Sequence, residues 1–311
     1  MKKLNSENNN IKKNIIVFQN IKTINTHQKA INAISVFPSG NLISISDDKS
    51  IILYDNNLNT IQKIRKAHNN SIEGLSIKDD NNFITSSTDN NIKNWIKRRN
   101  RFILNSTIEK AHKDLIYSIK YCKNGNIISY SKDKTIKIWE SINDNTFQNI
   151  ITIELSEKIN SILLLEFKNI LITLSDKGIK IWNFNNFDII KNIEEIKSIE
   201  KNAIAAIDED KIIFGGGTDN IMKIVSLKEK KILKKIDNKF QCYGICILRD
   251  KGYFIIGGYS RDINIYKNDN YECILHYECA HNGYISGFNL LIDNKILSYS
   301  FDKTIKVWEL I

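Results

Sequence analysis

One twelve-residue pattern recurs along the chain and constrains its fold more than any other feature of the sequence. Residues 129–140 read S-Y-S-K-D-K-T-I-K-I-W-E, and residues 298–309 read S-Y-S-F-D-K-T-I-K-V-W-E. The same frame holds residues 44–55 and 85–96. The pattern ends near a position that is aromatic in six of its seven copies, which we call the Trp position. It occurs seven times at intervals of 41 to 44 residues, at Tyr54, Trp95, Trp139, Trp182, Val225, Tyr266 and Trp308.

Two further residue types keep the same period. All four tryptophans of the chain occupy the Trp position. An aspartate lies six residues before it in six units, as Asp48, Asp89, Asp133, Asp176, Asp219 and Asp302. A histidine lies 21 residues before that aspartate in four units, as His27, His68, His112 and His281. A repeat of this length indicates one supersecondary unit per period, each packed on its neighbours.

Each unit contains four short segments rich in Ile, Val, Tyr and Phe, separated by polar turns, which is the pattern of β-strands. In the third unit we expect strands over Ile116–Tyr121, Asn126–Ser131, Thr135–Trp139 and Phe147–Ile153. Helical periodicity is essentially absent. The repeat is similar to that of the WD-repeat (WD40) family, whose unit of about 40–45 residues forms one four-stranded propeller blade. The resemblance implies an all-β, closed seven-bladed β-propeller with antiparallel blades.

The two ends of the chain predict how the ring closes. The last unit stops at Ile311, before an outer strand could follow. Residues 14–24 (N-I-I-V-F-Q-N-I-K-T-I) precede His27 as an outer strand precedes the other histidines. We therefore expect one propeller domain over residues 14–311, in which residues 14–24 complete the last blade, after a short polar tail of residues 1–13. Closure removes open strand edges, which favour aggregation.

The recurring Ser/Thr, His and Asp could suggest a hydrolytic triad. An enzyme does not need several copies of its nucleophile, so we expect a structural role and no catalytic activity. The resemblance implies a buried hydrogen-bond network of His, Ser/Thr, Asp and Trp in each complete blade. Its members would be His27, Asp48 and Tyr54; His68, Asp89 and Trp95; His112, Asp133 and Trp139; Asp176 and Trp182; and His281, Asp302 and Trp308. Blades 4 to 6 depart from the pattern, with Leu155 at the histidine position of blade 4.

Composition narrows the class of protein further. Residues 1–13 are polar and no apolar run reaches the roughly 20 residues that span a bilayer, so we expect a soluble, intracellular protein in the cytoplasm or nucleus, without membrane insertion. The five cysteines suit neither a disulfide framework nor a zinc site, and we expect no metal or cofactor. The net charge of +10 accompanies a Lys-, Asn- and Ile-rich composition, and the sequence has no nucleic-acid-binding motif, so nucleic acid is an unlikely partner.

Two repeat positions should line the face where loops converge on the central channel. One lies 24 residues before the Trp position and the other just before the turn aspartate. Together they place Tyr259, Tyr284, Phe301 and Cys242 over blades 6 and 7, and Lys132, Lys158 and Lys201 over blades 3 to 5, with Leu115 and Asp47 on the same face. Exposed aromatic residues are typical anchors of interfaces. We expect a protein-binding scaffold or adaptor whose partner carries aromatic and acidic residues. The alternative is a reader of peptide, ubiquitin or histone tails in a ubiquitin-ligase or chromatin complex.

Overall fold

The computed structural model describes residues 17–143, 146–195, 203–217 and 219–311. Its strands, in chain order, are β1 (Phe18–Asn25), β2 (Ile31–Val36), β3 (Leu42–Ser46), β4 (Ile51–Tyr54), β5 (Thr60–Ile64), β6 (Ile72–Asp79), β7 (Asn82–Ser87), β8 (Ile92–Arg98), β9 (Arg101–Ile108), β10 (Ile116–Tyr121), β11 (Ile127–Ser131), β12 (Thr135–Asn143), β13 (Thr146–Glu154), β14 (Ile159–Leu165), β15 (Ile170–Ser175), β16 (Ile179–Asn183), β17 (Ile189–Ile193), β18 (Ile204–Ala206), β19 (Lys211–Phe214), β20 (Ile221–Ser226), β21 (Lys231–Asp237), β22 (Cys242–Leu248), β23 (Tyr253–Gly258), β24 (Ile263–Lys267), β25 (Cys273–Tyr277), β26 (Ile285–Leu290), β27 (Ile296–Ser300) and β28 (Thr304–Leu310). Two 3-10 helices, Glu166–Lys168 and Arg249–Lys251, join inner strands to the strands that follow.

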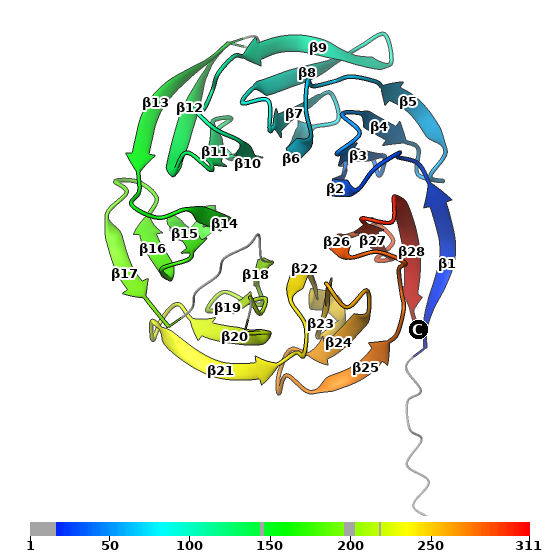
Figure 1. Ribbon diagram of the computed structural model, residues 1–311, viewed down its shortest axis with the longest axis vertical. Helices are drawn as coiled ribbons and strands as arrows, with labels where there is room; N and C mark the ends of the chain where they lie inside the picture. The colour runs from blue at the N-terminus through cyan, green and yellow to red at the C-terminus, as the bar shows by residue number, and fades with distance from the viewer. Residues whose placement is uncertain (1–16, 144–145, 196–202, 218) are drawn as a thin grey trace, which may run out of the picture.

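These strands form seven antiparallel four-stranded sheets arranged as blades around a central channel (Figure 1). Blades 1 to 6 take four consecutive strands each, from β2–β5 to β22–β25, with the first strand innermost. Blade 7 has the order β1-β28-β27-β26, so the N-terminal strand supplies its outer edge. The predicted all-β, seven-bladed fold is confirmed, and so is the joining of the N-terminal strand to the last blade.

The strands begin and end close to where the sequence pattern places them. In blade 3, β10 has the predicted bounds, β11 begins one residue later than predicted, and β12 and β13 are longer than predicted. The closing strand β1 spans Phe18–Asn25, while the predicted start at residue 14 lies outside the described residues. The prediction of a tail over residues 1–13 also falls outside them.

The core lies between neighbouring blades, because each sheet buries both of its faces. The second strand of blade 1, L-I-S-I-S, is buried at every position. Its isoleucines pack on one side against blade 2, where Phe83 and Trp95 lie, and Leu42 packs on the other side against blade 7. Both faces of these central strands are therefore buried, whereas outer strands such as β5 and β21 have only exposed and half-buried residues.

A β-bulge recurs in the outer strand pairs at the Trp position. The register shifts between Leu53 and Tyr54 in blade 1 and at the corresponding position of blades 2 to 6. A bulge bends the edge strand and disturbs its ladder of hydrogen bonds. Repeated around the ring, it reduces the tendency of the outer strands to pair with another chain.

Among the described residues, no helix is long and apolar enough to cross a membrane.

Candidate protein-binding face

Blade 7 shows most clearly how the polar residues of the repeat are arranged. The Trp308 indole nitrogen donates a hydrogen bond to Ser298 Oγ at 2.8 Å, and Ser298 Oγ lies 2.6 Å from His281 Nε2. On the other side of the ring, His281 Nδ1 lies 2.9 Å from Asp302 Oδ2. With an ionised aspartate, Nδ1 carries the proton and Nε2 accepts from the serine. The result is one chain of donors from Trp308 through Ser298 and His281 to Asp302.

The same chain occurs in blades 1, 2 and 3. His27, His68 and His112 each contact their turn aspartate through Nδ1 at 3.0 to 3.1 Å. Their Nε2 atoms lie 2.7 to 2.9 Å from the hydroxyls of Ser44, Thr85 and Ser129. Trp95 and Trp139 donate to these hydroxyls, and in blade 1 the Tyr54 hydroxyl takes the place of the indole N–H at 3.0 Å. Each buried polar group thus has a partner within its own blade.

These hydroxyls are poor candidates for a nucleophile. Ser44, Thr85, Ser129 and Ser298 are all completely buried, and each already contacts the aromatic residue of its blade. A nucleophile must reach a substrate, and these groups reach only the blade core. The network therefore holds the turn of each blade in place and lets the adjacent loop residues project toward solvent.

Blades 4 to 6 replace this network with other polar contacts. In blade 4 the buried Glu157 forms an ion pair with Lys180, and in blade 5 Asp219 forms one with Lys223. Blade 6 joins Asn238, Asn264 and the Tyr266 hydroxyl. His276, which lies outside the repeat frame of the other four histidines, contacts Asn264 Oδ1 through Nδ1 at 2.5 Å.

The position of Asp176 differs from the one that the sequence count predicts. In blades 3 and 7, the serine that accepts the indole hydrogen bond lies ten residues before the tryptophan. In blade 4 the accepting residue is Thr173, which lies nine residues before Trp182. The turn of blade 4 is therefore one residue shorter, and Gly178 at φ 142° closes it. A side chain on Gly178 would lie 2.6 Å from the Ile193 carbonyl oxygen. Asp176 is consequently exposed at the turn, and blade 4 has no histidine for it to contact.

Burial and hydrogen bonding shift the pKa values of this network in a way that predicts acid sensitivity. Burial lowers the pKa of His112 to about 4, against the opposing effect of Asp133, and it also lowers the pKa values of His68 and His281. Burial raises the pKa of Asp89, but hydrogen bonds from His68 and backbone amides outweigh this and lower it to about 2. Folding thus favours neutral histidines and ionised aspartates.

We expect the free energy of unfolding to fall as the pH drops from 7 to 4.5. Unfolded histidines take up protons below about pH 6.5, whereas the buried ones do so only at lower pH, so this stabilisation is lost first. The aspartate contribution is lost later, below about pH 4. For His112 the loss should be on the order of 2 kcal/mol. Urea unfolding at both pH values, on wild type and His112→Asn, measures it, and equal pH dependence in the two would contradict the assignment to His112.

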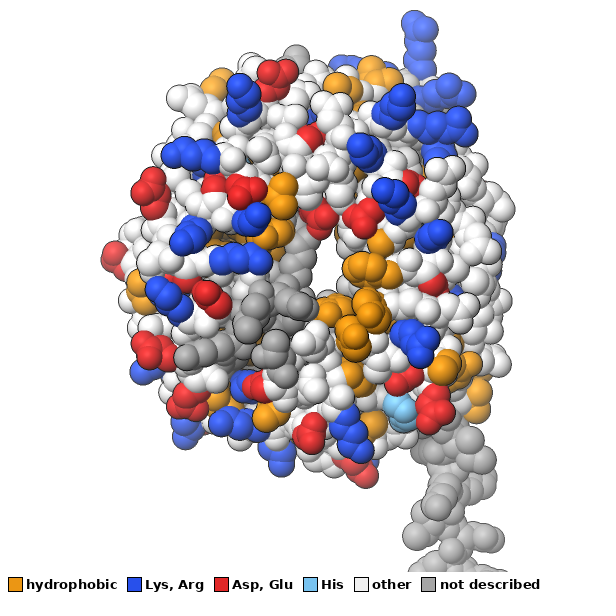
Figure 2. Space-filling model, viewed as in Figure 1, with side chains coloured by type: hydrophobic (Ala, Val, Ile, Leu, Met, Phe, Trp, Pro, Cys, Tyr) orange, Lys and Arg blue, Asp and Glu red, His pale blue; other side chains and the backbone are white. Residues whose placement is uncertain are grey.

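Aromatic side chains form an exposed cluster on the face where these turns converge. The Tyr259 and Tyr284 rings stack with centroids 4.4 Å apart, and the Phe301 ring lies 5.8 Å from that of Tyr284. Their side chains are 53%, 36% and 48% exposed, respectively. We call these three residues the aromatic ladder. Figure 2 shows apolar side chains beside the central opening over β22 and β26, where this ladder lies.

The structure also shows how the ladder is assembled from two repeat positions. The Phe301 amide donates to the Tyr284 carbonyl at 2.9 Å, and the Lys132 amide donates to the Leu115 carbonyl at the same distance. In blades 1, 2, 3 and 7 the residue before the turn aspartate is thereby held beside the residue that precedes the inner strand. Cys242, which was expected on this face, is completely buried instead.

Two of the predicted lysines, Lys132 and Lys158, lie on the other side of the opening and have partners of their own. Lys132 Nζ is 3.7 Å from Asp114 Oδ2, and Lys158 Nζ lies 5.2 Å from the centre of the Tyr117 ring. Leu115 is half-buried. Lys201 lies outside the described residues. Figure 2 shows blue side chains, with red ones among them, over β14 and its neighbours.

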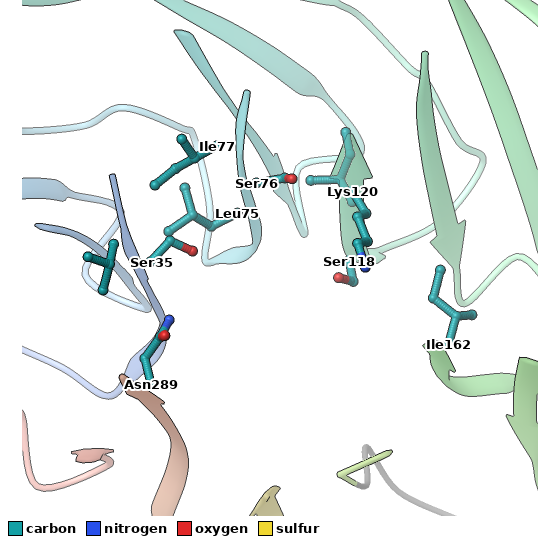
Figure 3. Close-up of a pocket in the computed structure, with 10 residues that line it drawn as sticks. Ser35, Leu75, Ser76, Ile77, Ser118, Lys120, Ile162 and Asn289 are labelled. Carbon is teal, nitrogen blue, oxygen red and sulfur yellow. The ribbon is translucent and has the colours of Figure 1, made fainter. Parts of the chain in front are cut away.

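A cavity of about 660 Å³ occupies the mouth of the channel between these two sides. Asp47, Glu73 and several tyrosines line it, together with the ladder residues Tyr284 and Phe301. Sequence reasoning missed most of this lining. A signal was present, because Asn32, Glu73, Tyr117, Asn160 and Ser286 all lie 22 residues before the Trp position. A second cavity of about 400 Å³ continues below it and shares Leu75 and Ser118; Figure 3 shows Lys120 and Asn289 at its wall.

No metal site is evident in the part of the chain that the structure describes, since no three His, Cys, Asp or Glu side chains gather there. Cys122, Cys242 and Cys246 are buried free thiols, and Cys273 and Cys279 are exposed ones. Burial raises the pKa of the Cys242 thiol to about 12, so this group is an inert member of the core.

Seven blades that close into a ring, four of them with a His–Ser/Thr–Asp network, define a β-propeller built from sequence repeats. Comparison with known proteins agrees. Residues 18–55, 59–95 and 104–140 match the family model described as "WD domain, G-beta repeat". The crystal structure of the WD40 β-propeller domain of Doa1 superimposes with a TM-score of 0.77 over 95% of this chain and 97% of that one, at 17% sequence identity. No curated protein matches the sequence. The chain thus contains three repeats that match the WD40 model, and its fold is a seven-bladed β-propeller.

Proposed function

We propose that this propeller is a non-catalytic scaffold or adaptor that binds partner proteins on the face around its channel mouth. The observation that carries this proposal is the aromatic ladder. Three large aromatic side chains stay between one third and about one half exposed beside a cavity. Clustered exposed aromatics next to a pocket are typical anchors of protein interfaces.

The basic side of the face should contribute less to the free energy of partner binding than the aromatic ladder. We propose that acidic residues of a partner contact Lys132 and Lys158, opposite the ladder, and also Lys201, which lies outside the described residues. Lys132 must then exchange its ion pair with Asp114 for one with the partner, whereas Lys158 can bind an acidic residue while it stays over the Tyr117 ring. Exposed ion pairs contribute only about 0–1 kcal/mol, so these lysines would orient a partner more than anchor it.

The remaining features fit a protein that works through binding. The Ser/Thr–His–Asp groups of blades 1, 2, 3 and 7 are occupied within the blade core. Buried free thiols suit a reducing compartment, so we place the protein in the cytoplasm or nucleus. Reading of basic tails, the alternative function, is favoured by one observation, the acidic lining of the channel mouth.

The test compares the partners of wild type with those of the variant Tyr259→Ala/Tyr284→Ala/Phe301→Ala. Affinity purification and mass spectrometry should recover a discrete set of proteins with wild type and lose it with the variant. The matched control is Ile61→Ala/Ile103→Ala/Leu104→Ala, which removes exposed apolar side chains from the outer strands β5 and β9 and should retain the set. Circular dichroism must show that all three proteins fold alike. Retention of every partner by the ladder variant would refute the proposed face.

A further inference from the structure

The hairpin between β8 and β9 concentrates positive charge at the perimeter of the ring. Residues 97–101 read K-R-R-N-R, and no other window of five residues holds more than three basic ones. We call these five residues the basic hairpin. Figure 1 shows this turn at the outer edge of the ring, and Figure 2 shows basic side chains gathered there. Its three arginines are exposed, and none of them forms an ion pair within the described residues.

The residues of this turn are not those that its conformation favours. Two residues join the strands, Arg99 at φ 48° and Asn100 at φ 64°. Two-residue hairpins need this left-handed conformation, which glycine and asparagine adopt more readily than arginine. Arg98 and Arg101 are direct partners in the strand register, and like charges in that position destabilise a sheet. Folding stability therefore does not explain three arginines at this turn.

The acidic residues of the adjacent turn already have hydrogen-bond partners. The turn between β6 and β7 lies beside the basic hairpin, since the Lys97 amide donates to the Asn81 carbonyl at 2.8 Å. Asp79 Oδ1 accepts from the Asn81 amide at 2.8 Å, and Asp80 Oδ1 accepts from the Ser39 amide at 2.9 Å. The arginines thus remain without a carboxylate partner next to two aspartates of their own blade.

Exposed aliphatic side chains continue from the arginines along the perimeter. Ile103 and Leu104 follow the turn on β9, Ile61 lies on β5, and each is about half exposed. The Gln62 side chain donates to the Phe102 carbonyl and accepts from the Phe102 amide, both at 2.8 Å, which holds these two outer strands side by side. We call Ile61, Ile103 and Leu104 the aliphatic edge.

We infer that the basic hairpin and the aliphatic edge together bind the surface of a membrane that contains anionic phospholipids. Guanidinium groups bind phosphate oxygens through paired hydrogen bonds. Branched side chains beside them can enter the boundary between the head groups and the acyl chains. Each basic residue held near such a surface adds to the attraction, which salt screens. The contact is peripheral and reversible.

The shape and composition of this region favour a lipid surface over other anionic partners. An extended peptide binds in a groove or along a free strand edge, and a projecting two-residue turn offers neither. Single-stranded nucleic acid is usually held by aromatic side chains on which its bases stack. The basic hairpin and the aliphatic edge contain no aromatic residue, and Phe102 between them is buried.

The inferred membrane contact is separate from the proposed protein-binding face. β8 runs from the turn of Asp89 to Arg98, so the basic hairpin lies at the opposite end of blade 2 from the loops of the channel-mouth face. A protein on the aromatic ladder would leave the hairpin accessible. The inference therefore goes beyond the scaffold function and does not depend on it.

Co-sedimentation of the full chain with vesicles tests the inference. Vesicles of phosphatidylcholine and phosphatidylserine should bind wild type, vesicles of phosphatidylcholine alone should not, and added NaCl should weaken binding. Arg98→Gln/Arg99→Gln/Arg101→Gln should weaken binding to the anionic vesicles by about tenfold or more. This variant removes the repulsion between Arg98 and Arg101, so it should unfold at a temperature no lower than wild type, which separates lost binding from misfolding.

A matched control removes the same charge elsewhere. Lys191→Gln/Lys234→Gln/Lys235→Gln changes three exposed lysines of the outer strands β17 and β21 and should alter vesicle binding by less than about twofold. The ladder variant Tyr259→Ala/Tyr284→Ala/Phe301→Ala should bind vesicles as wild type does.

The aliphatic edge has its own pair of variants. Ile103→Ala/Leu104→Ala should weaken vesicle binding by about threefold or more, because less apolar surface enters the membrane boundary. Ile189→Ala/Ile190→Ala truncates two exposed aliphatic residues of β17 and should bind as wild type does.

Four results would overturn the inference. They are failure of wild type to prefer anionic vesicles, equal losses for the arginine and lysine variants, wild-type binding by Ile103→Ala/Leu104→Ala, and binding of DNA or RNA, but not vesicles, that the arginine variant loses. The second would assign the attraction to the charge of the whole chain, and the fourth would assign the hairpin to nucleic acid. The scaffold function would stand in each case, since its own test depends on the ladder.

Discussion

Replacing Phe18 with alanine should lower the free energy of unfolding by about 3–5 kcal/mol, the range for truncating a buried aromatic side chain. Phe18 is only 7% exposed. Its ring stacks on Trp308 with centroids 5.0 Å apart and meets the Tyr277 ring edge-on at 5.9 Å. Since β1 and β28 come from opposite ends of the chain, these contacts also close the ring. Urea unfolding followed by circular dichroism and tryptophan fluorescence measures the loss.

The matched control is Ile21→Ala on the same strand. Ile21 is 43% exposed and lies where the β1–β28 register shifts, so its truncation should cost at most about 1 kcal/mol. If the two variants unfolded at the same urea concentration, the closing strand would contribute little to stability. Loss of closure also exposes the edge of β28, and Phe18→Ala should therefore aggregate at lower urea concentrations than Ile21→Ala.

The repeat was sufficient to predict the fold, because each signal in it reflects a constraint that one blade imposes on the next. The spacing of the Trp positions sets the number of blades, and the missing outer strand after Trp308 requires a strand from elsewhere in the chain. Residues 14–24 were the segment that fitted, and β1 lies there, beginning at Phe18 among the described residues. Closure could thus be predicted without knowing any contact.

Turn lengths and the channel wall were harder to predict. Asp176 has the usual sequence separation of six residues from Trp182, but Thr173 is one residue closer to Trp182 than its counterparts are. Counting back from the tryptophan alone cannot show where in the turn a residue is missing. The channel wall depends on how far each inner strand advances toward the axis. Glu73 and Asp47 occupy different repeat positions in different blades and converge only through Ser71. No period along the sequence records such a contact between blades.

Ser298→Ala should lower the free energy of unfolding by about 2–4 kcal/mol, although it removes a single oxygen atom. Ser298 Oγ accepts from the Trp308 indole nitrogen and donates to His281 Nε2, and all three residues are at most 1% exposed. Alanine would leave both partners buried without a hydrogen bond, which costs about 1–3 kcal/mol for each group. The control Ser35→Ala changes a half-buried serine of the channel wall and should alter stability by less than about 0.5 kcal/mol.

A double-mutant cycle with Trp308→Phe separates the network from a local packing effect. Phenylalanine removes the indole N–H, so in its presence Ser298→Ala strands one partner instead of two. The two changes together should then cost about 1 kcal/mol less than the sum of the single changes. Strict additivity would mean that Ser298 acts only by filling space. In that case the ion pair of blade 4 and the asparagine cluster of blade 6 would replace the His–Asp network only by filling the same space. Hydrogen bonding would then not explain why His, Ser and Asp recur with the blade period.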